Sequence, residues 1–72
     1  METQLSISGM TCGHCVAAVT EELESIKGVQ AVRVDLQAGG ISVATVVSDE
    51  AIPARTLGEA VAEAGYAVVG DA

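Results

Sequence analysis

The sequence predicts an α+β fold in which a four-stranded antiparallel sheet carries two helices on one face. Two observations predict it. Three short stretches begin with apolar residues at alternate positions, as half-buried strands do, and a short fourth stretch ends the pattern. Two longer stretches repeat apolar residues every three or four positions, as one face of a helix does. These stretches follow one another in the order βαββαβ, which is two βαβ halves in tandem. We therefore expect a ferredoxin-like open-faced sandwich formed by a single domain, residues 1–72.

The first half of the chain contains a strand, a loop and a helix. Leu5 and Ile7 alternate with serines, which predicts the first strand, and a loop at residues 9–14 follows it. Apolar residues then recur at spacings of three, four and three, which predicts a helix with a glycine as its C-cap. The apolar residues are Val16, Val19, Leu23 and Ile26, and the capping glycine is Gly28.

Two strands and a turn are expected in the middle of the chain. Val32, Val34 and Leu36 alternate with charged residues, which predicts the second strand. Gln37–Gly40 makes a turn, and Ile41 and Val43 then begin a third strand that reaches to about Val47.

The second helix and a short last strand complete the pattern. Pro53 suits the first turn of the helix, and Gly65 ends it. Gly58 within it is expected to cost about 1 kcal/mol of stability relative to alanine. Residues 66–69 form the last strand. The buried face of the helix is marked by Leu57, Ala60, Val61 and Ala64.

The expected chain directions bring three segments to one end of the molecule, which we call the upper end. These segments are the loop at 9–14, the Gln37–Gly40 turn and the Gly65–Tyr66 junction. None of them contains Asp, Glu, Lys or Arg. The acidic residues are expected mainly on the helices and at the opposite end.

Composition and charge disfavour several classes of protein. A 72-residue chain forms only a small core, and an interior active-site cavity would remove packing that the fold needs, which argues against an enzyme. Its net charge of −7 disfavours nucleic acids and anionic membranes as partners. The longest apolar run, Cys15–Val19, is far shorter than the ~20 residues of a membrane span, and no signal peptide is visible. We therefore expect a cytoplasmic protein that does not insert into membranes.

Cys12 and Cys15 are separated by only two residues. A disulfide closing so short a loop would stabilise the fold little, so the pair indicates redox chemistry or a metal, and neither sulfur is expected in the core. Soft thiolates favour Cu(I), Zn(II) and other thiophilic metals. Gly13 is expected to let the loop bend, and the helix start at Cys15 to lower the pKa of its thiol.

The number of ligands favours Cu(I) over Zn(II). A structural zinc site takes four ligands, commonly from separated segments, whereas this chain offers two cysteines beside His14 and no second cluster. Two or three soft ligands satisfy Cu(I). The alternative from another class is a small dithiol oxidoreductase. A thioredoxin-type fold would need a longer chain and a proline against the dithiol, and Pro53 is expected at the opposite end.

The stretch Met10-Thr11-Cys12-Gly13-His14-Cys15 stands between a strand and an amphipathic helix. In this setting it resembles the metal-binding motif of heavy-metal-associated domains. These include bacterial copper chaperones and the N-terminal modules of copper-transporting P-type ATPases. The resemblance covers nearly the whole chain, through Gly28-Val29 to Ala64-Gly65-Tyr66.

The resemblance implies that Cys12 and Cys15 bind the metal. It also implies that Met10 packs under the loop, where core packing is favoured over metal ligation, and that Tyr66 lies beside the metal. Tyr66 either caps the edge of the core or supports the thiolates. Zinc-transporting relatives often carry Asp at the position of Thr11, so this residue favours copper.

His14 departs from the small residue that is commoner at its position in the family. It resembles the variant of some bacterial copper chaperones and is a candidate additional ligand, although a solvent-facing side chain is favoured. With copper in excess, two chains are expected to share the metal through their upper ends as a homodimer. The metal-free protein is expected to be a monomer.

The resemblance implies a Cu(I)-binding metallochaperone that is not an enzyme. It would deliver copper to a copper-transporting P-type ATPase by thiolate ligand exchange. The alternatives are an N-terminal metal-binding module of such an ATPase, a module of the same fold that binds Zn, Cd or Hg, and the dithiol oxidoreductase.

Overall fold

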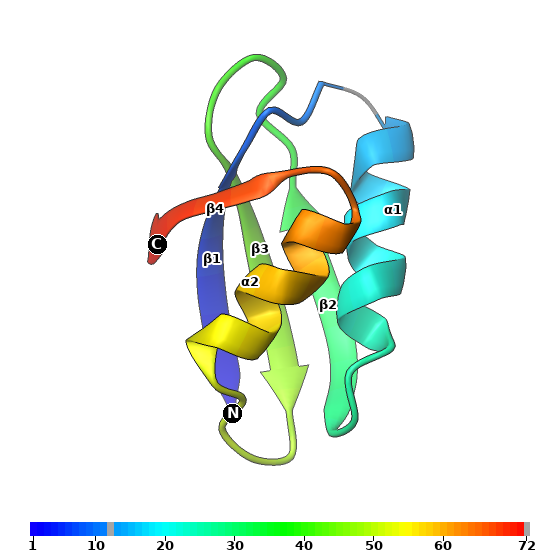
Figure 1. Ribbon diagram of the computed structural model, residues 1–72, viewed down its shortest axis with the longest axis vertical. Helices are drawn as coiled ribbons and strands as arrows, with labels where there is room; N and C mark the ends of the chain where they lie inside the picture. The colour runs from blue at the N-terminus through cyan, green and yellow to red at the C-terminus, as the bar shows by residue number, and fades with distance from the viewer. Residues whose placement is uncertain (12, 72) are drawn as a thin grey trace.

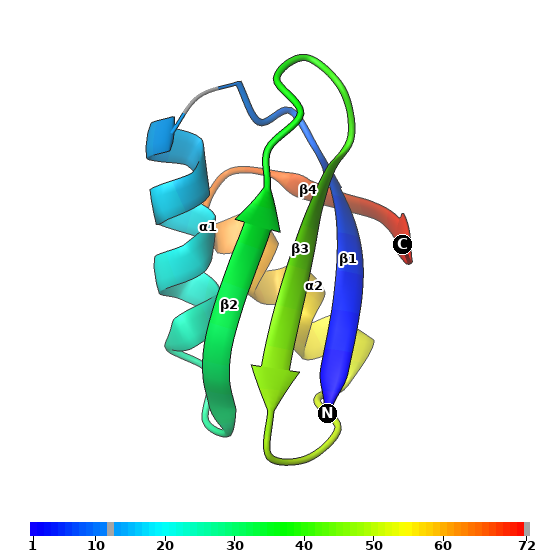
Figure 2. The same cartoon turned by 180° about the vertical axis from the view of Figure 1, so that it is seen from behind.

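The structure is a computed structural model that describes residues 1–11 and 13–71. Its four strands form one antiparallel sheet in the order β2-β3-β1-β4, and both helices lie on the same face of that sheet (Figure 1 and Figure 2). The predicted ferredoxin-like sandwich is therefore confirmed. The elements are β1 (Glu2–Ser8), α1 (Gly13–Glu24), β2 (Val29–Asp35), β3 (Ser42–Ser48), α2 (Ala54–Glu63) and β4 (Ala67–Asp71).

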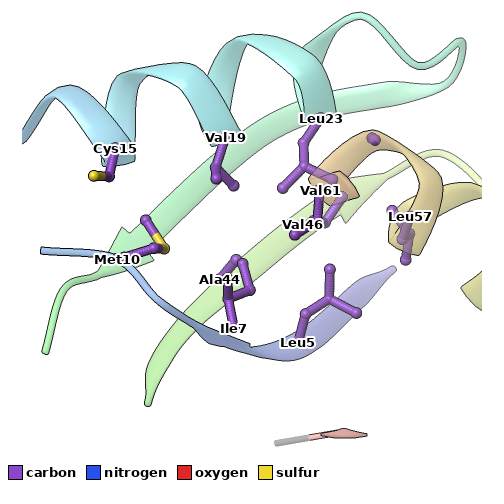
Figure 3. Close-up of a cluster of buried hydrophobic side chains, with 11 residues drawn as sticks. Leu5, Ile7, Met10, Cys15, Val19, Leu23, Ala44, Val46, Leu57 and Val61 are labelled. Carbon is purple, nitrogen blue, oxygen red and sulfur yellow. The ribbon is translucent and has the colours of Figure 1, made fainter. Parts of the chain in front are cut away.

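The core lies between the sheet and the two helices. Figure 3 shows that Met10 and Cys15 lie together at one end of the buried cluster. All of the buried apolar side chains are aliphatic or contain sulfur, so close packing of small groups must hold the fold together. They are Leu5, Ile7, Met10, Cys15, Val19, Leu23, Ala44, Val46, Leu57, Ala60 and Val61.

Helix α1 begins and ends earlier than predicted. It ends at Glu24, so Ile26 lies outside the helix, although its side chain still packs against the core. The Ser25 hydroxyl donates to the Glu22 carbonyl oxygen at 2.7 Å, a local bond that competes with helix continuation. Gly28, with φ 98°, precedes β2 in a turn instead of capping the helix.

Strand β3 is shifted by one residue from the predicted register. It begins at Ser42, and Ile41 precedes it with half of its surface exposed (50%). Ala44 and Val46 are buried in the core, whereas Val43 is only half-buried. Because side chains alternate between the two faces of a strand, Ile41 and Val43 belong to the face away from the helices.

Serines at the two ends of β3 explain why its register differs from the predicted one. Ser42 and Ser48 occupy the same face as the buried aliphatic residues, where a polar side chain masks the apolar alternation. Both hydroxyls have a partner: Ser42 Oγ accepts the Gln37 N–H at 2.9 Å, and Ser48 Oγ donates to the Glu50 carbonyl oxygen at 2.7 Å. Burial of these two polar groups is therefore tolerated.

The C-terminal third follows the prediction with small shifts. Pro53 directly precedes α2 as its N-cap residue, and Gly65, with φ 95°, follows the end of that helix as expected. Strand β4 starts at Ala67, one residue after Tyr66, and runs to Asp71. Within the described residues, no helix combines the length and the apolar character that crossing a membrane requires.

Gly58 offers a direct test of the helix α2 assignment. A Cβ added there meets nothing within 4 Å. Gly58→Ala is expected to raise the free energy of unfolding by about 1 kcal/mol, because alanine gives up less backbone freedom in a helix. Gly65→Ala is the matched control: its Cβ also has room, but its φ of 95° is unfavourable for alanine, so it is expected to destabilise by about 1 kcal/mol. Chemical denaturation measures both, and shifts of the same sign would contradict the assignment.

Candidate metal centre

Three segments meet at the upper end of the fold. They are the β1–α1 loop (described at residues 9–11), the β2–β3 connection and the α2–β4 junction. The Gly39 N–H donates to the Met10 carbonyl oxygen at 3.4 Å, which joins the first two segments, and Figure 1 shows them together at the top. A Cβ added at Gly9 would lie 3.6 Å from Cδ1 of Tyr66, which brings in the third. The predicted meeting of these segments is therefore confirmed.

Cys15 is the third residue of α1 and is only 8% exposed. The expectation that neither sulfur belongs to the core is wrong for this residue. Cys15, Val19 and Leu23 follow one another at intervals of four and lie on one face of the helix, so packing α1 against the sheet buries all three (Figure 3). The spacing is visible in the sequence, but a cysteine two residues from another indicates a ligand more strongly than it indicates a core residue, although a free cysteine packs like a small apolar side chain.

Thr11 reaches from the β1–α1 loop toward this sulfur. Thr11 is exposed, and its Oγ1 lies 3.9 Å from Cys15 Sγ, a hydrogen-bonding distance for sulfur. The side chain therefore connects an exposed position of the loop to a buried residue in the first turn of α1. This contact could not be predicted from the sequence, because it depends on how the loop enters α1.

Met10 belongs to the β1–α1 loop, and its side chain packs into the core with none of its surface exposed. Its side chain belongs to the buried cluster and extends toward the end where Cys15 lies (Figure 3). The interpretation of Met10 as a core residue is therefore confirmed. A flexible thioether fills such irregular space well.

Gly13 and His14 begin α1, and both are exposed. A Cβ added at Gly13 would meet nothing within 4 Å. The structure places Gly13 at the first position of α1, and its expected role in bending the loop stays a prediction. Gly9 is the loop glycine with a positive φ, 89°.

Tyr66 packs its ring against the core edge and against the β1–α1 loop. It is half-buried, and its N–H donates to the Val61 carbonyl oxygen at 3.1 Å at the end of α2. The ring approaches Gly9, three residues before Cys12 in the chain. Tyr66 thus lies at the upper end, as the order of the elements predicts.

Cys12 lies outside the described residues, so its pairing with Cys15 stays a prediction. Within residues 1–11 and 13–71, no three side chains of His, Cys, Asp or Glu gather closely enough to hold a metal ion. The described part of the centre comprises the Cys15 sulfur, the Thr11 hydroxyl beside it, and the support given by Met10 and Tyr66.

Comparison with known proteins places this arrangement in a family. The copper chaperone CopZ of Staphylococcus aureus is 37% identical over 65 residues, which cover 90% of this chain and 93% of that protein. A solved structure described as a CopZ metallochaperone superposes with a TM-score of 0.84 and 33% identity, covering 96% of this chain and all of that one (100%). The solution structure of the Atx1-Cu(I)-Ccc2a complex is similar with a TM-score of 0.73 and 25% identity, covering 99% and 97%.

The model of the heavy-metal-associated domain matches residues 4–67, which extend from the first strand to the start of the last. The matched region contains both cysteines, both helices and the two strands between them, together with most of β1 and the first residue of β4. The chain therefore belongs to the heavy-metal-associated domain family.

Proposed function

We propose that this protein is a Cu(I) metallochaperone. It binds Cu(I) through Cys12 and Cys15 and passes the ion to the metal-binding domain of a copper-transporting P-type ATPase. The observation that carries the proposal is the position of Cys15 in the first turn of α1, at the uncharged upper end. Its similarity to CopZ chaperones over nearly their whole length supports the same function.

The chemistry of the donor set suits a monovalent soft ion. Two thiolates satisfy Cu(I), whereas Zn(II) would have to recruit further ligands. The first turn of α1 carries no acidic residue, and its N–H groups favour negative charge on the Cys15 sulfur. Thr11 is placed to donate a hydrogen bond to that sulfur and hold it in position.

Transfer proceeds by ligand exchange. A partner thiolate forms a bond to copper, a host thiolate then leaves and takes up a proton, and the oxidation state of copper does not change. The uncharged upper end lets two such domains approach, because the acidic residues lie elsewhere and salt at about 0.15 M screens charges beyond about 8 Å. A partner of the same fold is supported by the likeness to the Atx1-Cu(I)-Ccc2a complex.

The exchange alters no organic substrate, so the protein is not an enzyme in this proposal. We place it in the cytoplasm, where thiols stay reduced and able to bind a soft metal. His14 is exposed beside Cys15, and in a copper-bridged pair of chains its imidazole would supply a nitrogen ligand.

Removal of both sulfurs is expected to abolish tight Cu(I) binding. Since Cys15 is buried, the variant of choice is Cys12→Ser with Cys15→Ala, which puts no hydroxyl into the core. Anaerobic competition with graded Cu(I) chelators, repeated with Zn(II), measures the affinity. Val19→Ala is the control, because it removes buried methyl groups one turn further along α1 and is expected to lower stability without lowering copper affinity. Tight copper binding by the double variant would overturn the proposal.

Copper is expected to move to a second C-x-x-C domain faster than it dissociates. A shared-copper intermediate explains this, since the incoming thiolate bonds before the outgoing one leaves. Stopped-flow transfer to a recipient domain is compared with loss to excess chelator. A recipient with both cysteines changed to serine is the control, and equal rates in the two cases would contradict ligand exchange.

Tyr66→Ala is expected to lower copper affinity by about tenfold, the lower end of the range for residues that support metal ligands. The ring covers Gly9 and so shields the loop that carries Cys12. Tyr66→Phe keeps the ring and isolates the contribution of the hydroxyl. The same chelator competition measures both variants, and affinities unchanged in both would make Tyr66 a residue of the core edge alone.

A further inference from the structure

Met10 is held from two sides. Its side chain is fully buried in the core, and its carbonyl oxygen accepts the long hydrogen bond, 3.4 Å, from the Gly39 N–H. The side chain fixes the residue to the core beneath, and the hydrogen bond fixes it to the β2–β3 connection. Because Cys12 follows two residues later, the position of this connection bears directly on the β1–α1 loop.

The β2–β3 connection is itself shaped by two shorter hydrogen bonds. The Gly40 N–H donates to the Gln37 carbonyl oxygen at 2.9 Å, and the Gln37 N–H donates to Ser42 Oγ at 2.9 Å. Gly39, between them, has a φ of 76°, a left-handed backbone conformation that residues with a side chain rarely adopt. The connection thus has a defined shape, and Ser42 closes it.

Ser42 lies where the sheet ends and the β1–α1 loop begins. It is fully buried, and it pairs with Ile7, near the end of β1. A hydroxyl at this depth destabilises the fold unless it is bonded, and its partner here is the first residue of the turn, Gln37. Ser48, at the other end of β3, is buried to the same degree but bonds to Glu50, far from the upper end.

We propose that Ser42 is a positioning residue for the metal-binding loop. Through Gln37 and Gly39 it fixes the Met10 carbonyl, and with it the backbone that leads into Cys12. This inference rests on the proposed function, and it adds a residue that touches neither the metal nor a ligand. A loop held in advance loses less freedom when the ion binds, which strengthens binding.

Ser42→Ala and Ser48→Ala form a matched pair for the test. Both remove a buried, bonded hydroxyl from the same face of the same strand, so both are expected to lower stability by similar amounts. Only Ser42→Ala is expected to weaken Cu(I) binding, by about fivefold, the change that loss of one ordinary hydrogen bond produces. In the metal-free protein, only Ser42→Ala is expected to speed amide hydrogen exchange at Gln37 and Gly39.

Gly39→Ala and Gly28→Ala give a second pair that leaves the serines intact. Their φ values are 76° and 98°, and an added Cβ meets nothing within 4 Å at either, so each variant strains one turn without a clash. Gly39→Ala is expected to weaken Cu(I) binding, and Gly28→Ala, at the opposite end of the sheet, is not.

The outcomes separate this inference from the proposed function. If the unaltered protein binds Cu(I) tightly and neither pair differs in affinity, the positioning role is overturned and the chaperone proposal stands. If the unaltered protein fails to bind Cu(I), the chaperone proposal falls. Amide exchange at Gly39 then decides alone: faster exchange only in Ser42→Ala supports the link to the loop, and equal exchange in both serine variants overturns it.

Discussion

The packing of α1 against the sheet sets the position of the sulfur on which the candidate centre depends. Cys15, Val19 and Leu23 enter the core together, so the helix cannot rotate without exposing aliphatic surface. The core contains no large aromatic rings, so its small side chains interdigitate closely and leave little empty space in which α1 could shift. The orientation of α1, and hence of its first turn, is therefore a product of the same contacts that stabilise the domain.

The upper end is held by a different kind of interaction. Met10 and Tyr66 anchor its segments to the core edge, while backbone hydrogen bonds and glycines with positive φ shape the connections. None of the described residues in these connections carries a formal charge, and the net charge of −7 resides elsewhere. The surface that a partner would contact is thus held in place by short-range contacts. It also lies away from most of the acidic side chains that would repel an acidic partner.

The element order could be predicted because alternation at Leu5 and Ile7, and at Val32 and Val34, is strong, and two helical repeats separate the strands. The register of β3 could not be predicted, because its buried face begins and ends with serine. A serine is buried only where a hydrogen-bond partner is available, and the partner of Ser42 comes from a turn whose shape depends on tertiary structure.

The meeting of three segments at one end also follows from chain order, since direction alternates along the fold. The contacts between Thr11 and Cys15 and between Gly39 and Met10 do not follow from it. They depend on the exact course of the loops, for which the sequence has no periodic pattern. The burial of Cys15 was predictable in principle, because its spacing from Val19 continues the apolar face of α1.

The burial of Cys15 also limits how the centre can change during evolution. A donor at this position must fit a space that is 8% exposed and bordered by aliphatic groups, which suits a small, weakly hydrated sulfur. A carboxylate or imidazole there would be larger and would lose its hydration, so the domain would lose stability before it gained a hard-metal ligand. Changes of metal preference would therefore arise at exposed neighbouring residues such as Thr11 and His14. Position 15 would keep its cysteine, because a larger or more polar ligand there would destabilise the core.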